Sequence, residues 1–328
     1  MLTTTARRPT NNLPPSLLMK APCPEQLPMW PEPTRGGPNA LLRSAFFAGI
    51  HSKKRRRLGT QPGVDKEPEG VMIAAQDGIK IKYAGTQLNQ YDADVFFEAV
   101  HRARKEPLGT ECVFGGSDFL REIGRSDSKG NYNDLDESLR RLRRGELEAE
   151  WTINGRHYIF TGSLIASYVR ETTTKHYKVT FAKEVRTLFA TASWTQLEWE
   201  QRKALKGKPL AQWLHSYFST HAAPFPVSVA YLHEKSGSPT TLLKHFKTEL
   251  KRAFESLHDT LGWEFVWDDN LVALTRPPSA SQARHIQRKV QKADRVKKER
   301  EMTKRRQYAN ELTPVSSILS GLFTPARV

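Results

Sequence analysis

The stretch Ser236–Gly262 constrains the fold of this chain more than any other, because its pattern predicts one long helix with defined ends. Ser238 stands at an N-cap position, Pro239 at the first helical position, and Gly262 directly after the end. The apolar residues recur three or four positions apart and therefore share one helix face: Leu243, Phe246, Leu250, Phe254, Leu257 and Leu261.

A neighbouring face of this helix is basic. Lys244, Lys247 and Lys251 lie on it, with Thr240 and Thr248 beside them. By itself this pattern fits a solvated amphipathic helix as well as a helix that contacts a polyanion. The elements on either side of the helix distinguish between these two interpretations.

Those elements predict a winged helix-turn-helix. A helix over Leu210–Thr220, a short strand at Phe225–Val227 and a helix over Val229–Lys235 precede the long helix. A hairpin over Trp263–Thr275 follows it. Helix, strand, two helices and a terminal hairpin form the order in which the last helix enters the major groove and the hairpin is the wing.

The same order occurs earlier in the chain. It comprises a helix at Tyr91–Ala103, a strand at Cys112–Phe114, helices at Ser117–Ile123 and Asn133–Arg144, and a hairpin at Glu146–Phe160. We therefore expect an α+β chain with two tandem winged-helix domains and disordered basic N- and C-terminal tails. The expected boundaries are a tail at 1–70, a first domain at 71–170, a second at 171–276 and a tail at 277–328.

Charge is concentrated in the tails. The net charge is +16 in total, with +6 in residues 1–70, +8 in residues 277–328 and only +2 between them. A nucleic-acid surface on the folded part must therefore come from local segregation of charge. In the C-terminal tail, Arg284–Arg306 fits a solitary basic helix that becomes ordered on a partner, or a plain disordered tail.

Two islands stand out in the N-terminal region. Gln26–Trp30 is a compact hydrophobic peptide that suits docking into a preformed pocket, or else a chance cluster in a Pro-rich tail. Lys53–Arg57 is a run of five cations that would lend non-specific affinity for DNA or RNA without sequence choice.

Enzyme motifs are missing from the sequence. There is no His-hydrophobic-His triplet beside a tyrosine, no phosphate-binding G-x-x-x-x-G-K-[ST], no H-E-x-x-H and no G-x-S-x-G. Cys23 and Cys112 lie far apart, so neither a disulfide framework nor a zinc cluster is indicated. We expect no catalytic residue, no metal, no cofactor and no membrane span, and a cytoplasmic location.

Double-stranded DNA is the partner that this order of elements favours. In the second domain the residues expected to contact the bases or the phosphates of DNA belong to the long helix: Thr240, Thr241, Lys244, His245, Lys247, Thr248, Lys251 and Arg252. In the first domain they are Ser128, Lys129, Asn131, Asn133, Arg140 and Arg144.

The second domain is expected to be the stronger DNA binder. Its net charge is +3, whereas that of the first domain is −1. Asp134, Asp136 and Glu137 interrupt the last helix of the first domain and weaken the case for deep insertion. A protein-contact role and a DNA role stay equally open for that domain.

The chain resembles the TrfA-type plasmid replication initiators. The segments Thr187–His221 and Pro226–Arg276 are similar to the C-terminal half of that family, and Asp77–Gly85 is similar to the start of its first winged helix. The resemblance implies binding to repeated sequences, called iterons, in a plasmid origin, opening of an adjacent AT-rich segment, and contact with the single strand of that segment. It also implies recruitment of host DnaA and the replicative helicase, and an active monomer beside an inactive dimer.

The resemblance further implies a peptide that binds the host sliding clamp. The residues at its positions are Gln26, Leu27, Met29 and Trp30. Two other functions stay open from the sequence: a winged-helix transcriptional repressor, and a nicking or priming replication enzyme whose motifs have diverged.

Overall fold

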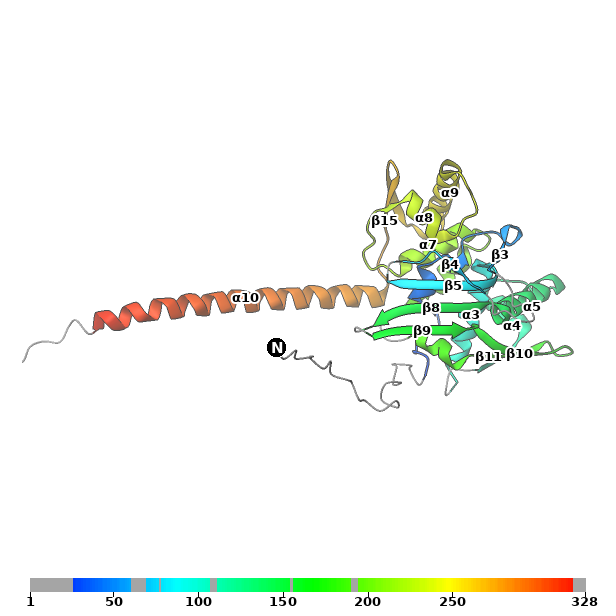
Figure 1. The fold of residues 1–328 in the computed structure, drawn as a ribbon, viewed down its shortest axis with the longest axis horizontal. Helices are drawn as coiled ribbons and strands as arrows, with labels where there is room; N and C mark the ends of the chain where they lie inside the picture. Colours follow the sequence, from blue (N-terminus) through cyan, green and yellow to red (C-terminus); the bar gives the residue numbers. More distant parts are fainter. Residues whose placement is uncertain are drawn as a thin grey trace, which may run out of the picture. The chain divides into compact units, whose positions relative to one another are not determined.

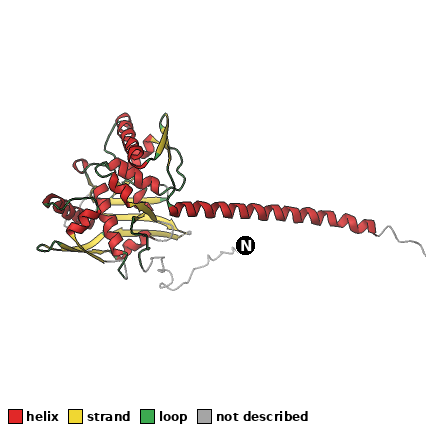
Figure 2. Cartoon of the chain, turned by 180° about the vertical axis from the view of Figure 1, so that it is seen from behind, coloured by secondary structure: helices red, strands yellow, loops and turns green. Residues whose placement is uncertain are grey.

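The computed structural model describes residues 26–59, 69–76, 78–106, 111–153, 156–189 and 194–320. The chain divides into two compact units, residues 1–276 and 277–328. Helices and strands are mixed throughout the first unit (Figures 1 and 2), as the sequence predicts. The disorder expected for the tails concerns in part residues 1–25, 60–68 and 321–328, which lie outside the described residues.

The described part of the N-terminal region is folded, which corrects the disorder expected for it. Its elements are β1 (Thr34–Pro38), α2 (Asn39–Leu42), β2 (Phe47–Ala48), η1 (Ser52–Lys54) and β3 (Arg57–Leu58). Each strand pairs with one far along the chain: β1 with β12 (Trp194–Glu198), β2 with β6 (Leu88–Asn89), and β3 with β5 (Ile79–Thr86). Because these pairings are long-range, no periodicity within the segment could reveal them.

The elements of the first half follow the predicted order. They are α3 (Gln90–Ala103), β7 (Glu111–Gly115), α4 (Gly116–Glu122) and α5 (Lys129–Arg144). A capping box starts α3, because the Asn89 side chain accepts from backbone N–H groups while the Asp92 carboxylate accepts from the Asn89 N–H. Helix α5 begins before the expected Asn133, because the Ser128 hydroxyl caps it by accepting from the Asn131 N–H at 3.4 Å.

The hairpin expected to be the first wing lies in another sheet, which is a correction. Strands β8 (Glu146–Ile153) and β9 (Arg156–Gly162) join β3, β5 and β4 (Val71–Ile73) in a five-stranded sheet. The reason is packing: Ile81, Ala149 and Phe160 stand side by side in register and are all buried.

A later hairpin takes the place beside β7. Strand β7 pairs with β11 (His176–Phe181), and β11 pairs with β10 (Ile165–Glu171). The expected domain boundary between residues 170 and 171 therefore falls at the end of β10, inside this hairpin. The hairpin belongs with the first half of the chain because its inward residues are part of the first core.

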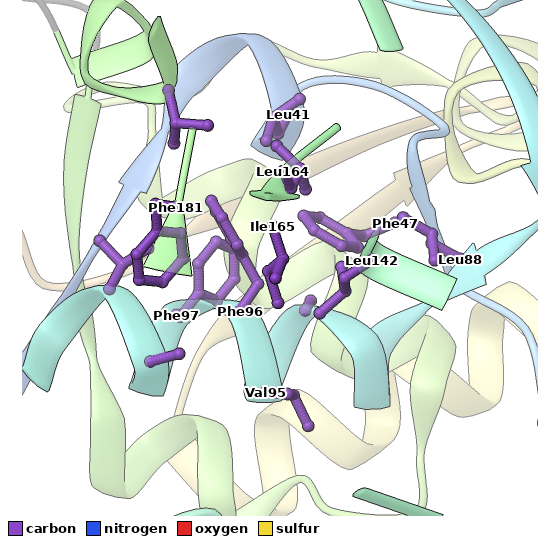
Figure 3. Packing of buried hydrophobic residues seen from close by; sticks show 14 of the residues in the cluster. Leu41, Phe47, Leu88, Val95, Phe96, Phe97, Leu142, Leu164, Ile165 and Phe181 are labelled. Atoms are coloured by element: carbon purple, nitrogen blue, oxygen red, sulfur yellow. The ribbon is translucent and has the colours of Figure 1, made fainter. Parts of the chain in front are cut away.

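The first hydrophobic core extends from Leu27 to Trp199 and is arranged around α3. Figure 3 shows Phe96 and Phe97 of α3 among Phe181, Ile165 and other buried side chains. The ring centroids of Phe96 and Phe181 lie 6.3 Å apart and their rings are near perpendicular. The core therefore joins the folded N-terminal segment, the helices and the β10–β11 hairpin.

The second core extends from Leu205 to Leu274. The elements from the end of the first core onward are η2 (Lys183–Phe189), β12, α6 (Trp199–Ala204), α7 (Pro209–Ser219), β13 (Val227–Ser228), α8 (Val229–Ser236), α9 (Leu243–Leu261), β14 (Glu264–Asp268) and β15 (Leu271–Thr275). Strand β15 lies between β13 and β14 in one sheet, so the short strand pairs with the hairpin as a winged helix requires.

Buried polar contacts attach the second half to the first. The guanidinium of Arg202 is fully buried, and its Nε lies 2.5 Å from Oδ1 of Asp94 on α3. Trp213 Nε1 donates to the Ser44 carbonyl oxygen at 3.1 Å. Burial of a charge is tolerated here because each partner is also hydrogen-bonded to further groups.

The second compact unit contains one long helix, α10 (Ala280–Ser320). It is strongly basic, and Val290 and Met302 on it are 54 % and 57 % exposed. Of the two alternatives that the sequence left open for Arg284–Arg306, the structure has the helix. Within the described residues, neither α10 nor any other helix combines the length and the apolar character that crossing a membrane demands.

Candidate nucleic-acid interface

Helix α9 exposes a cationic arc. Its buried residues are four of the six predicted ones together with Ala253: Phe246, Leu250, Ala253, Phe254 and Leu257. Of the other two predicted residues, Leu261 is half-buried and Leu243 is exposed. The opposite side exposes five of the residues expected to bind DNA: Lys244, His245, Thr248, Lys251 and Arg252. Glu255 and Asp259 are exposed only further along, so positive charge is concentrated in the N-terminal half of the helix.

The start of α9 differs from the prediction. The helix begins at Leu243 with Leu242 at the N-cap, and not at Ser238 and Pro239. The reason is tertiary, because Nε2 of His233 on α8 lies 2.6 Å from the Thr240 carbonyl oxygen and holds the segment before the helix. The correction places Thr240 and Thr241 in the turn, with Thr240 half-buried and Thr241 exposed.

Two apolar side chains at this end were not predicted as contacts. Leu242 is 52 % exposed and Leu243 is 41 % exposed, so Leu243 does not share the buried face expected for it. Apolar side chains at the tip of a groove-reading helix can contact the methyl group of thymine. The late helix start exposes both residues, and the sequence pattern gave no sign of that start.

The β14–β15 hairpin lies along one flank of α9. Lys247 Nζ is 3.0 Å from Oδ1 of Asn270 and 3.8 Å from Oδ1 of Asp269 in the hairpin turn. Lys251 Nζ lies 5.7 Å from the centre of the Trp267 ring. The two lysines therefore position the hairpin in addition to presenting charge.

The basic run Lys53–Arg57 lies along another flank of α9, which the sequence did not suggest. Lys54 Nζ is 3.7 Å from Oε1 of Glu249. Arg55 is half-buried and bonds Oδ1 of Asn89 at 2.7 Å and Oδ2 of Asp92 at 2.9 Å, so it anchors the run. The other four cations of the run are exposed.

In the first half, α5 exposes two of the cations predicted to bind DNA, Lys129 and Arg144. Lys129, Asn133 and Arg144 are exposed and have no side-chain partner within the described part of the chain. The remaining predicted residues are engaged locally: Ser128 caps the helix, Asn131 bonds Ser126, and Arg140 pairs with Glu137.

The acidic residues of α5 have different roles. Asp136 pairs with Arg170 and accepts from the Tyr177 hydroxyl at 2.9 Å, so it fastens the β10–β11 hairpin to the helix. Asp134 is exposed and Glu137 pairs with Arg140 on the surface. Asp134 and Glu137 therefore place negative charge on the exposed surface of α5, whereas Asp136 is half-buried.

The predicted sliding-clamp peptide is packed into the first core, which corrects its expected accessibility. Leu27 and Trp30 are buried, whereas Met29 is 64 % exposed. Trp30 stacks on Phe189 with ring centroids 6.0 Å apart. Gln26 Nε2 donates to the Arg104 carbonyl oxygen at 3.5 Å. The two apolar side chains that would have to enter a clamp pocket, Leu27 and Trp30, are instead packed inside the first core.

Two buried histidines are kept neutral. Burial lowers the pKa of His215 to about 3, and the nearby Arg202 and Arg276 add to this effect. Burial likewise lowers the pKa of His101 to about 3, together with Arg35 and Arg104 and against the opposing effect of Glu32. Both belong to the cores, and no group of acidic, Cys or His side chains in the described residues could hold a metal ion.

The chain is similar in sequence to a known protein. A curated relative, the plasmid replication initiator protein TrfA of Escherichia coli, is 27 % identical over 252 residues, which cover 75 % of this chain and 63 % of the relative. The chain thus spans less than two thirds of that relative's length.

Three solved structures are distantly similar. Two crystal structures of RctB domains 2 and 3 have TM-scores of 0.47 and 0.44 at 11 % and 12 % identity, and cover 67 % and 66 % of this chain and 95 % and 93 % of theirs. A crystal structure of the Pi initiator protein in complex with iteron DNA has a TM-score of 0.39 at 10 % identity, and covers 57 % of this chain and 93 % of that one.

The family comparison covers most of the folded unit. The model of the family described as TrfA protein matches residues 24–276, from just before Gln26 to the last residue of the first compact unit. The chain belongs to the TrfA protein family.

Proposed function

We propose that this chain initiates the replication of a plasmid by binding iteron DNA at its origin. The observation that carries the proposal is the cationic arc of α9, which is exposed and bordered by the β14–β15 hairpin. A helix of this kind fits the major groove, and a hairpin beside it reaches the adjacent backbone. The similarity to a plasmid replication initiator supports the same function.

The order of elements supports two tandem winged-helix domains. In the second, α7, β13, α8 and α9 precede the β14–β15 hairpin, which pairs with β13. In the first, α3, β7, α4 and α5 precede the β10–β11 hairpin, which pairs with β7. We assign the stronger DNA contact to α9, because its first half carries exposed cations without an interspersed unpaired carboxylate.

Further partners follow from the proposed function. An initiator would open the AT-rich DNA beside its iterons, recruit DnaA and the replicative helicase, and be regulated by self-association as a dimer. Binding of a sliding clamp through Gln26–Trp30 would require the buried Leu27 and Trp30 to leave the first core. No catalytic step by the chain itself is part of the proposed function.

A footprint of the purified chain on the DNA around its gene tests the proposal. The expected result is protection of direct repeats spaced by about two helical turns, with permanganate-reactive thymines in the adjacent AT-rich DNA. Replacing Lys244 and Lys251 by Ala should remove the protection, whereas Lys183→Ala, at an exposed lysine of η2, should not.

Two other results would contradict the proposal. Protection of a single operator over a promoter without thymine reactivity would favour a transcriptional repressor. Cleavage of supercoiled origin DNA by the pure chain in magnesium would show a nicking enzyme.

A further inference from the structure

Two residues of α9 that lie close together contact different elements. Lys247 bonds Asn270 of the β14–β15 hairpin, and Glu249 pairs with Lys54 of η1. At about 100° per residue, positions two apart lie roughly 200° apart around a helix. The hairpin and η1 therefore border opposite flanks of α9, and the exposed Thr248 lies between them.

We propose that Lys53, Lys54 and Arg56 form a second phosphate-binding surface on the flank of α9 opposite the hairpin. This inference rests on the proposed DNA binding by α9 and adds a contact from a distant part of the chain. The ligand is the sugar-phosphate backbone of a DNA duplex. With α9 in the major groove, the hairpin would meet one backbone and this basic surface would meet the other.

The dimensions of helix and groove support two flanking contacts. The major groove is about 12 Å wide and an α-helix with its side chains is about 10–12 Å across. A helix that fills the groove therefore brings both of its flanks close to a phosphate backbone. Any element fixed against either flank must then carry charge that phosphate tolerates.

The basic surface is held in place before DNA arrives. Arg55 is bonded to the buried Asp92, the Arg56 carbonyl oxygen accepts from the Gln87 N–H at 2.8 Å, and Arg57 pairs with Thr86 in the sheet. A fixed surface loses less conformational entropy on binding than a free basic tail would lose. Five cations in a row therefore divide into one anchor, Arg55, and four exposed charges.

Charge around this flank is net positive. A surface cavity of about 300 Å³ lies between η1 and α9, and its charged lining is Lys54, Lys208, Arg252 and Glu249. Glu249 is the one carboxylate in that lining, and Lys54 lies against it. An exposed pair of this type adds little to stability because water screens both charges, so Lys54 is able to turn to a phosphate.

The salt dependence of DNA binding tests the inference. The probe is a duplex with the sequence that the wild-type chain protects in the footprint. The double substitution Lys53→Ala and Lys54→Ala is expected to make the negative slope of log K against log salt less steep. The change should be about 0.9 per lost phosphate contact, nearly two units in all. Lys183→Ala, the matched control on η2, should leave the slope unchanged.

A second variant separates a phosphate contact from mere neutralisation of Glu249. If Lys54 acts only by masking that carboxylate, Lys54→Ala combined with Glu249→Gln will restore the wild-type slope, and this would overturn the inference. If Lys54 contacts phosphate, the slope of this double variant stays about one unit low. Unchanged slopes in the Lys53/Lys54 variant would also overturn it, whereas a wild-type chain that protects no DNA would refute the proposed function itself.

Discussion

Trp30 Nε1 donates a hydrogen bond of 2.9 Å to Nδ1 of His101, and both side chains are buried. The other ring nitrogen of His101 lies 3.1 Å from Oε2 of Glu32. The bond fixes His101 as the neutral form that carries its proton on Nε2. It also ties the segment before β1 to α3, the central helix of the first core.

Replacing Trp30 should therefore destabilise the fold. Trp30→Ala is expected to lower the free energy of unfolding by about 3–5 kcal/mol, because it leaves a large cavity. Trp30→Phe should cost about 1–3 kcal/mol, because it leaves His101 Nδ1 unpaired. Urea unfolding measures both values. The neighbouring Met29, which is 64 % exposed, provides the control, since Met29→Ala should change stability by no more than about 0.5 kcal/mol. Equal urea midpoints for Trp30→Ala and Met29→Ala would show that the peptide is not part of the core.

Gly262, which ends α9, should not tolerate a side chain. Its φ is +66°, and a Cβ built there meets no atom within 4 Å, so the cost is purely one of backbone conformation. Gly262→Ala should destabilise the chain by about 1–2 kcal/mol. Gly130 in α5 is the matched control, because its Cβ would also meet open space but its conformation is helical. Gly130→Ala is therefore expected to stabilise by about 0.5–1 kcal/mol, and thermal unfolding of the two variants should shift in opposite directions.

We expect Lys247 to have two separable roles in DNA binding. Lys247→Ala should lower the salt slope by about one unit and also loosen the hairpin turn. Asn270→Ala removes the 3.0 Å bond to Lys247 but keeps the lysine charge, so affinity should fall while the slope stays near the wild-type value. Lys251→Ala should lower the slope by about one unit. If Lys247→Ala leaves the slope unchanged, Lys247 only positions the hairpin.

Stability should fall below pH 6.5. The pKa of both His101 and His215 is lowered to about 3 in the folded chain, against about 6.5 when unfolded. Between these values the unfolded chain binds more protons, so the stabilisation is complete above pH 6.5 and is lost as pH falls through this window. At pH 5.5 the loss should be about 1.4 kcal/mol for each histidine.

Thermal unfolding at pH 7.0 and pH 5.5 measures this loss. The pKa of Glu32 is lowered to about 2, chiefly by its hydrogen bond to Lys105, so this carboxylate loses its contribution only in more acidic solution. His215→Phe keeps a ring beside Trp263, whose centroid lies 5.4 Å from that of His215, and should reduce the pH dependence by about half. An undiminished dependence in this variant would exclude His215 as a source.

For α9, the pattern of neighbouring residues predicted most features of the helix but not its start. The periodicity of Phe246, Leu250, Phe254 and Leu257 predicted the buried face, and therefore also the exposed arc with Lys244 and Lys251. The Gly262 stop and the following hairpin were also predicted, because each depends on residues a few positions apart. The predicted start of the helix at Ser238 and Pro239 was wrong. A contact from His233 on another helix, and not the local Ser-Pro signal, determines where α9 begins.

The sequence by itself determined the elements whose causes are local: the amphipathic faces of α3 and α9, the order of helices, and the segregation of cations on α9. Only the tertiary structure decided which hairpin pairs with β7, that Leu27 and Trp30 are core residues, and that Lys54 lies against Glu249. Helical periodicity depends on residues three or four positions apart, whereas strand pairing and burial depend on residues far apart in the chain. The folded chain therefore brings the basic run near its N-terminal end to the same helix that carries the predicted DNA-binding residues.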